Sequence, residues 1–89
     1  MRTEQVFKAL ADPTRREILK RLKRGSLNAG QLADHFPMTK GSLSHHFNVL
    51  KAADLVRCER RGQQQFYSIN ITVFEEVAAS ILGLFSIHK

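Results

Sequence analysis

The segment from Thr39 to Asn48 carries the side chains of this sequence that are best suited to reading another molecule by hydrogen bonds. Leu43, Phe47 and Leu50 recur at i, i+4 and i+7, the spacing of one apolar face of a helix. The opposite face then presents small, neutral donors and acceptors, where a merely solvated helix would carry a mixture of Glu and Lys. Such groups can enter a major groove and bond to base edges or phosphates without steric or charge conflict. The candidate residues for this contact are Thr39, Lys40, Ser42, Ser44, His45 and Asn48.

A second group of cationic and amide side chains lies between two strand-like runs, residues 56–60 and 65–69. Gly62 supplies the positive φ that a tight turn needs, so the two runs are predicted to pair as a β-hairpin with a polar tip. A tip of this composition favours contact with the DNA backbone or minor groove over plain exposure to solvent. The candidate residues are Arg60, Arg61, Gln63 and Gln64, joined by Arg16 from an earlier helix.

Two helices are predicted to open the chain. The first follows Thr3, where apolar residues fall at helical spacing. The second begins at Asp12-Pro13, because Asp accepts orphan N–H bonds and Pro loses none at the first helical position, and it runs to about Arg24. Arg15 falls on the apolar side of this helix and is interpreted as a structural arginine paired inside the protein. Arg16 is interpreted as solvated or facing a phosphate.

The next two predicted helices form a helix-turn-helix candidate. Asn28 and Gln31 have the spacing of a capping box, which starts a third helix of about two turns that Pro37 stops. Thr39 can cap a fourth helix, from about Lys40 to Ala52, after a connection of two or three residues. The polar candidates of the first group therefore lie on the second helix of the pair.

The last predicted helix, from a capping box at Thr72 and Glu75 to about Ile87, is too apolar for one small domain to cover. The predicted core stripe is Phe74, Val77, Ala78, Ile81, Leu82 and Phe85, and the residues that widen it are Val73, Leu84 and Ile87. The surplus is expected to pack on a second copy of the chain, together with the first helix. The expected dimer residues are Val6, Val73, Val77, Ile81, Leu84 and Phe85.

Composition limits the other classes of function. The 89 residues are enough for a single domain, 1–89, and the net charge of +6 with a pI near 10.1 favours a polyanionic partner. Catalysis is not expected, since there is no Cys–His pair or phosphate-cradling Gly-rich loop, and neighbouring Ser44 and His45 would point about 100° apart on a helix. No signal peptide or membrane span is predicted, so the expected location is the cytoplasm.

A metal site or other cofactor is not expected either. Cys58 is the one cysteine of the sequence, and it is interpreted as a small buried hydrophobe. Among the histidines, His45 faces outward, His46 lies beside the core stripe as a packed, hydrogen-bonded residue, and His35 is a surface residue. Soft ligands for a transition metal are therefore lacking.

Four motifs follow one another in order: ADPTRREIL at 11–19, AGQLA at 29–33, SLSHHFNVL at 42–50, and Gly62 followed by Phe66-Tyr67-Ser68. Together they resemble the ArsR family of bacterial winged-helix repressors over nearly the whole chain. The resemblance implies a mainly α winged helix-turn-helix of five helices and a two-stranded wing, dimeric through its terminal helices. It also implies that the fourth helix enters the major groove and the wing touches the flanking backbone. Within the family the chain most resembles short, metal-independent autorepressors that lack sensing cysteines.

The leading hypothesis is a sequence-specific transcriptional repressor that binds an inverted-repeat operator in double-stranded DNA as a homodimer and regulates its own gene. The alternatives are a metal-sensing ArsR-type repressor, a sequence-indifferent nucleic-acid binder, and a protein interaction module built on the last helix. The lack of an acidic outer face on the fourth helix argues against the interaction module, and the small polar residues there argue against the sequence-indifferent binder. The operator sequence, the inducing signal and any protein anti-repressor stay unidentified.

Overall fold

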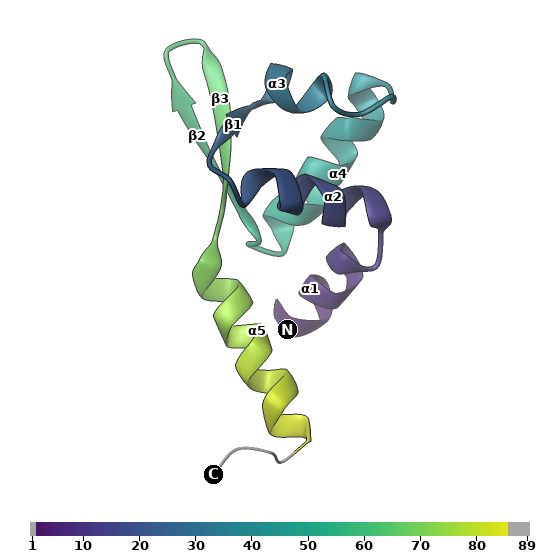
Figure 1. Cartoon of the computed structure of the whole chain (residues 1–89), viewed down its shortest axis with the longest axis vertical. Coiled ribbons are helices and arrows are strands. Elements are labelled where there is room, and N and C mark those ends of the chain that lie inside the picture. The colour runs from purple at the N-terminus through teal and green to yellow at the C-terminus, as the bar shows by residue number, and fades with distance from the viewer. Residues whose placement is uncertain (1, 86–89) are drawn as a thin grey trace.

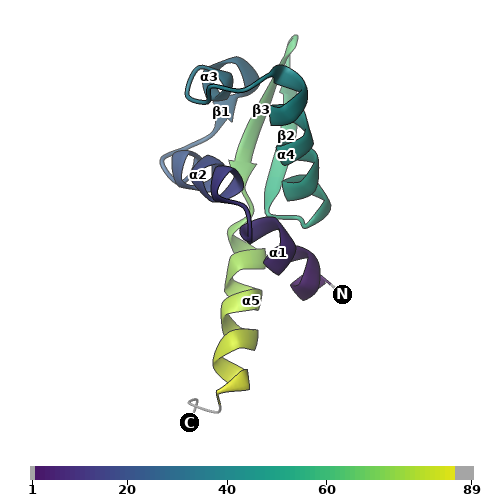
Figure 2. The same ribbon diagram turned by 90° about the vertical axis from the view of Figure 1, so that its right-hand side faces the viewer.

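Five helices and three short strands follow one another along residues 2–85, the part of the chain that the computed structural model describes (Figure 1). Helices α1 to α4 and the sheet surround the core, while α5 projects away from it (Figures 1 and 2). The expected winged helix-turn-helix with five helices is confirmed. The elements are α1 (Arg2–Leu10), α2 (Pro13–Leu22), β1 (Leu27–Asn28), α3 (Ala29–Ala33), α4 (Lys40–Ala52), β2 (Val56–Arg61), β3 (Gln64–Ile69) and α5 (Ile71–Leu84).

The starts of α2 and α3 are fixed by the side chains expected to cap them. Asp12 accepts the backbone N–H of Arg15 at 3.1 Å, and Pro13 occupies the first position of α2. The capping box of α3 is complete, because Asn28 Oδ1 accepts from Gln31 N at 2.7 Å and Gln31 Oε1 accepts from Asn28 N at 2.9 Å. Unsatisfied N–H groups of the first turn are bound in each case, which stabilises the helix at that residue.

Helix α3 is shorter than expected. It ends at Ala33, after which the N–H groups of His35 and Phe36 bond to carbonyls three residues earlier, at 3.0 and 3.2 Å. These bonds tighten the chain into a turn before Pro37, because a residue before proline is disfavoured in helical conformation. The connection to α4 is therefore residues 34–39, longer than the two or three residues expected.

Helix α5 begins after a single residue that follows β3. The prediction of a capping box at Thr72 and Glu75 is wrong. The helix starts at Ile71, and Asn70 precedes it without a side-chain capping bond. The backbone N–H of Asn70 instead donates to the carbonyl of Leu55 at 2.9 Å. One residue thus separates the end of the sheet from the start of α5.

The sheet contains a strand that was not expected from the sequence. Within residues 2–85, β3 is the central strand of an antiparallel sheet of three, with β2 on one side and the two-residue β1 on the other. Asn28 of β1 pairs with Phe66 of β3. In the β2–β3 hairpin, here called the wing, Arg61 pairs with Gln64 and Gly62 has a φ of +62°, as expected. The wing is thus attached to the start of α3 and is not a free two-stranded ribbon.

One apolar core joins the helices to the base of the wing. Leu43, Phe47 and Leu50 are buried, which confirms the expected inner face of α4. Cys58, however, is exposed, so its expected burial is wrong. Strand β2 buries only its first residue, Val56, because the rest of the strand extends past the core as the wing. The fully buried large side chains are Val6, Ile18, Leu32, Leu50, Leu55 and Val73.

An apolar row on α5 starts in the core and continues beyond it. Val73 and Val77 are buried, Ile81 is half-buried and Leu84 is 77% exposed, since the helix projects past the other elements (Figure 2). The expected division of this helix was therefore partly wrong, because Val73 belongs to the core instead of widening it. The residues expected in the core stripe but found exposed are Ala78, Leu82 and Phe85. Ile87 lies outside the described residues.

Candidate nucleic-acid interface

Helix α4 is fixed at its N-terminus and along its inner face. Thr39 Oγ1 accepts the backbone N–H of Ser42 at 3.1 Å, and its hydroxyl also donates to the hydroxyl of Ser42 at 3.1 Å. Leu43, Phe47 and Leu50 pack into the core below. The rotation of the helix about its axis is set by these contacts, and the opposite face is left to solvent.

The outer face of α4 presents the expected polar side chains. Ser44, His45 and Asn48 are exposed, as are Lys40 and Ser42 in the first turn. The helix contains no Asp or Glu along its whole length. A polyanion can therefore approach this face without meeting a carboxylate, and its hydroxyl, imidazole and amide groups can bond to base edges or phosphates.

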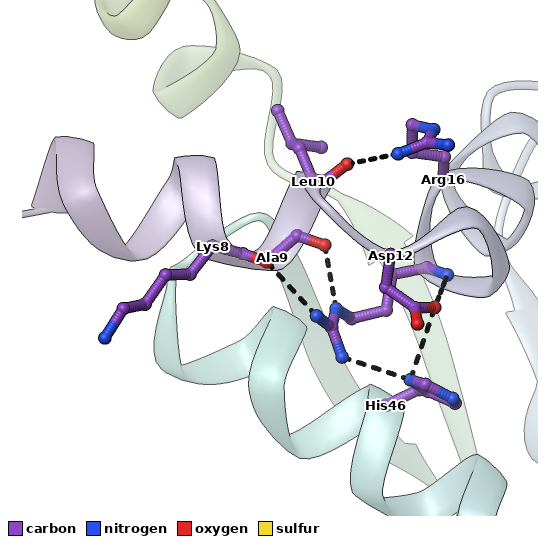
Figure 3. A network of polar contacts seen from close by, with 7 residues as sticks. Lys8, Ala9, Leu10, Asp12, Arg16 and His46 are labelled. Atoms are coloured by element: carbon purple, nitrogen blue, oxygen red, sulfur yellow. Dashed lines mark hydrogen bonds and ion pairs between the residues drawn. The ribbon is translucent and has the colours of Figure 1, made fainter.

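A polar network supports the back of α4 against α1 and α2 (Figure 3). Arg15 donates from Nε to the carbonyl of Ala9 at 2.7 Å and from Nη2 to the carbonyl of Lys8 at 3.1 Å. Its Nη1 lies 3.2 Å from Nδ1 of His46, which is 3.8 Å from Oδ2 of Asp12. The expected roles of Arg15 as an internally paired arginine and of His46 as a packed, hydrogen-bonded histidine are confirmed.

Asp12 is held in its charged form by the same network. Partial desolvation raises the pKa of its carboxyl group. The backbone N–H of Arg15 and the positive charges of Arg15 and of protonated His46 lower this pKa, and together they have the larger effect. The net result is a pKa below the ordinary value of 3.8. Asp12 therefore caps α2 and faces the Arg15–His46 contact at once.

Aromatic stacking joins α4 to the wing. The centroids of the Phe47 ring and of the Tyr67 ring on β3 are 4.4 Å apart, with 23° between the ring planes. Burial raises the pKa of the Tyr67 phenol, and the neighbouring Cys58 thiol adds to that effect. Because Tyr67 lies on the central strand, a rotation of α4 would disturb the sheet as well. The two candidate DNA-contacting elements thus form one packed unit.

Arg60 and Arg61, which follow one another near the tip of the wing, point to opposite faces, because side chains alternate along a strand. Arg61 binds Glu59, with Nη2 3.1 Å from Oε1, and its guanidinium lies 4.7 Å from the centroid of the Phe66 ring. Arg60 donates from Nε to the carbonyl of Gly62 at 3.3 Å. The charge of Arg61 is thus partly compensated by a neighbouring carboxylate, whereas that of Arg60 is engaged only with its own turn.

Two neighbours of the candidate residues were not identified from the sequence. Glu59 lies two residues before Arg61, so the period of two in a strand carried a usable signal for this pair. Asn28 donates from Nδ2 to Oε1 of Gln64 at 3.3 Å while its own side-chain oxygen caps α3. No local pattern links residues so far apart in the chain. Gln64 is therefore attached to α3, and Gln63 lies in the turn of the wing.

Arg16 lies apart from the other candidates. Its Nη1 donates to the carbonyl of Leu10 at 2.7 Å, and its side chain borders a pocket beside Ile69, the last residue of β3. Gln64 begins that strand, roughly 17 Å away at the usual rise of an extended chain. The structure thus places Arg16 at the base of the wing, not at its tip.

Residues 2–85 contain no group of three or more His, Cys, Asp or Glu side chains that could hold a metal ion. His35 is exposed in the turn after α3. The rings of His45 and His46 are 5.7 Å apart, but His46 is engaged with Arg15. In the same part of the chain, every helix is too short or too polar to span a bilayer.

Known proteins similar to this chain are transcription regulators. The family model described as "Bacterial regulatory protein, arsR family" matches residues 12–57. The transcriptional repressor SdpR of Bacillus subtilis (strain 168) is 51% identical over 71 residues, which cover 80% of this chain and 79% of that protein. An arsenical resistance operon repressor of Staphylococcus xylosus is 38% identical over 65 residues, covering 73% and 62% respectively. The crystal structure of an ArsR family transcriptional regulator matches with a TM-score of 0.91 at 31% identity, covering 98% of this chain and 96% of that one.

Proposed function

The chain belongs to the arsR family of bacterial regulatory proteins, and we propose that it represses transcription by binding an inverted-repeat operator as a homodimer. It is a DNA-binding transcriptional regulator and not an enzyme, as the sequence predicted. The proposal adds three features to that family assignment: a specific operator, a second copy of the chain, and control of its own gene.

The observation that carries sequence-specific binding is the outer face of α4. Ser44, His45 and Asn48 are exposed on a helix whose rotation is fixed from behind by the core and the Arg15 network. Hydrogen bonds to base edges carry sequence information, whereas contacts to phosphates position the protein without reading the sequence. We assign base reading to these three residues, and contact with the DNA backbone to Thr39, Lys40, Ser42 and the wing residues Arg60, Arg61, Gln63 and Gln64.

A second copy is supported by the apolar surface at the far end of the molecule. Leu84 is 77% exposed, Phe85 69%, Leu82 50% and Phe7 of α1 44%. Helices α1 and α5 lie at the end opposite the tip of the wing in both views (Figures 1 and 2). Covering such side chains gives a dimer a substantial hydrophobic contribution. Pairing there would leave both copies of α4 free for two half-sites about one helical turn apart.

The proposed interface is narrower than the set of residues expected from the sequence. Val6, Val73 and Val77 are already buried in the core of one protomer, so they support the dimer face from below. The residues proposed to touch the second copy are Phe7, Ile81, Leu82, Leu84 and Phe85.

We further propose that the repressor acts in the cytoplasm and does not sense metal ions. The name of the Staphylococcus xylosus relative favours an arsenic-responsive alternative for this chain. Tight binding of soft metals requires several thiolates, however, and the sequence holds one cysteine, Cys58.

The test uses the DNA upstream of the chain's own gene. Footprinting is expected to show a protected inverted repeat. Fluorescence anisotropy is expected to show an affinity for this repeat at least about 10³-fold higher than that for a random duplex at the same salt concentration. Equal affinity for both duplexes would support the sequence-indifferent binder instead.

A further inference from the structure

An apolar pocket lies where α1, α2, the end of β3 and the start of α5 meet. Its apolar lining consists of Leu10, Leu19, Ile69, Ile71 and Phe74, and its volume is about 350 Å³. Pockets that hold small molecules have volumes in this range. The pocket lies at the base of the wing, and none of the base-reading residues proposed on α4 borders it.

The rim of this pocket is positively charged. Arg16, Lys20 and Lys23 border it at i, i+4 and i+7 along α2, and no acidic residue of the described chain does so. The acidic residue of that helix, Glu17, lies 3.5 Å from Arg21, and both border a different pocket. A row of cations therefore stands beside an apolar floor.

We propose that this pocket binds a small apolar carboxylic acid, such as a medium-chain fatty acid. The alkyl chain displaces water from Leu19, Ile69 and Phe74, which is favourable in proportion to the apolar area covered. The carboxylate remains at the rim beside Lys20 or Lys23, where it forms a charge-assisted hydrogen bond. A neutral hydrocarbon lacks the second contribution and a small polar anion lacks the first, so the pocket selects molecules that have both parts.

The position of the pocket connects it to DNA binding, and this step rests on the proposed function. Leu10 and Leu19 belong to the body that carries α4, whereas Ile71 and Phe74 lie in the first turn of α5, which carries the proposed dimer face. Along the chain, one residue, Asn70, connects the end of β3 to the start of α5. An acyl chain inserted there moves α5 relative to α4 and changes the separation of the two reading helices in the dimer. The bound acid thus lowers affinity for the operator.

The direct test is an amide NMR titration of the full chain with decanoate, below the concentration at which decanoate forms micelles. Saturable shifts are expected at Leu10, Leu19, Ile69 and Phe74. Decanol and decylammonium, which share the alkyl chain but lack the negative charge, are expected to bind more weakly.

Matched variants separate the charge from the apolar floor. Lys23→Gln is expected to weaken decanoate binding by about two- to fivefold, the usual size of one partly exposed ion pair. Arg24→Gln removes the same charge from the next residue, which borders the other pocket, and is expected to leave decanoate binding unchanged. Ile71→Gln changes a side chain that is 61% exposed, so the fold is retained while the apolar lining of the pocket loses one of its five side chains.

Operator binding is measured on the same protein with and without decanoate. If the ligand-free chain binds no operator, the proposed function fails, whatever the pocket does. If it binds, decanoate is expected to weaken operator binding by at least about fivefold, and the Ile71→Gln variant is expected to show a smaller effect at the same decanoate concentration. Equal binding of decanol, shifts confined to Leu82, Leu84 and Phe85, or pocket shifts that follow protein dilution alone would overturn the assigned ligand. Pocket binding with unchanged operator affinity would overturn the role in control.

Discussion

The guanidinium of Arg15 on α2 lies 3.2 Å from the imidazole of His46 on α4, and the same guanidinium binds two carbonyls at the end of α1 (Figure 3). His46 directly follows His45, which faces outward on the proposed reading face. On the other side, Phe47 is stacked on Tyr67 of the sheet. Helix α4 is thus held from two directions, so the proposed entry into a DNA groove would require little further ordering of this helix.

The first prediction concerns the stability contributed by Arg15. Arg15→Met keeps the aliphatic stem but removes the contacts to Lys8, Ala9 and His46. We expect the free energy of unfolding to fall by about 1–3 kcal/mol, because two carbonyls and an imidazole lose their partly buried, charged partner. Urea denaturation followed by circular dichroism measures this change.

Arg16→Met is the matched control for that experiment. Arg16 makes one exposed bond, to the carbonyl of Leu10, so its replacement is expected to cost less than about 0.5 kcal/mol. Equal losses for the two variants would contradict the specific role of Arg15.

The second prediction concerns acid. The pKa of Asp12 is lower in the folded chain than its ordinary value of 3.8, so the folded state binds that proton more weakly than the unfolded state. The stability contributed by the carboxylate is therefore present above the ordinary value and is lost as the pH falls through the folded value. Asp12→Asn keeps a side chain that can cap α2 but cannot ionise. The difference in melting temperature between wild type and Asp12→Asn is expected to shrink as the pH falls below about 4, and a difference independent of pH would contradict the charge effect.

Local patterns predicted the helices well because their signals act over three or four residues. Asp12, Asn28 and Thr39 each bind an N–H group three residues ahead, so the sequence around each is enough to place the start of a helix. The helical spacing of the apolar residues on α4 likewise predicted both its buried and its exposed face. The helical part of the candidate site could therefore be predicted from the sequence alone.

Features that depend on distant parts of the chain could not be predicted in this way. Strand β1 is two residues long and exists only through its pairing with Tyr67 and Phe66 of β3. The exposure of Cys58 depends on how far the wing extends past the core, which no local pattern records. The apolar face of α5 could be predicted from the sequence, but the assignment of Val73 outside the core is wrong. The point where α5 leaves the other elements is set by tertiary packing, which the pattern of this helix does not contain.

The third prediction tests the proposed dimer. Leu84→Glu places a charge at the exposed end of the apolar row, and it is expected to raise the dimer dissociation constant by more than about tenfold, since each copy loses a leucine that the proposed dimer would bury. Sedimentation velocity at micromolar concentration measures this change. Ala79→Glu, on the polar side of the same helix, is the control and is expected to leave the dimer intact. A wild-type chain that sediments as a monomer would exclude the proposed assembly.

The fourth prediction concerns metal ions. Operator affinity is expected to be the same with a chelator, with zinc and with arsenite, because the described residues provide no cluster of three ligands and the chain has one thiol. Anisotropy titrations in the three conditions test this expectation. A tenfold change in either direction would support the metal-sensing alternative.

The fifth prediction separates the roles of α4 and the wing. Asn48→Ala is expected to cost on the order of 1–3 kcal/mol on the operator and little on a random duplex, because a base-edge contact is lost. Arg61→Ala is expected to weaken both duplexes alike and to reduce the slope of log K against log salt by roughly one unit, because a phosphate contact is lost. Both variants are measured on both duplexes across a salt series.

Glu59→Gln provides the matched test of the wing, since it removes the carboxylate that binds Arg61 while leaving the arginine in place. With its charge no longer compensated, Arg61 is expected to bind phosphate more strongly, so affinity should rise on both duplexes and the salt slope should steepen. In the Glu59→Gln background, Arg61→Ala should then cost more than it does in the wild type.

If Asn48→Ala weakened operator and random DNA equally, α4 would not be the reading element, and the sequence-indifferent binder would become the better account of this chain.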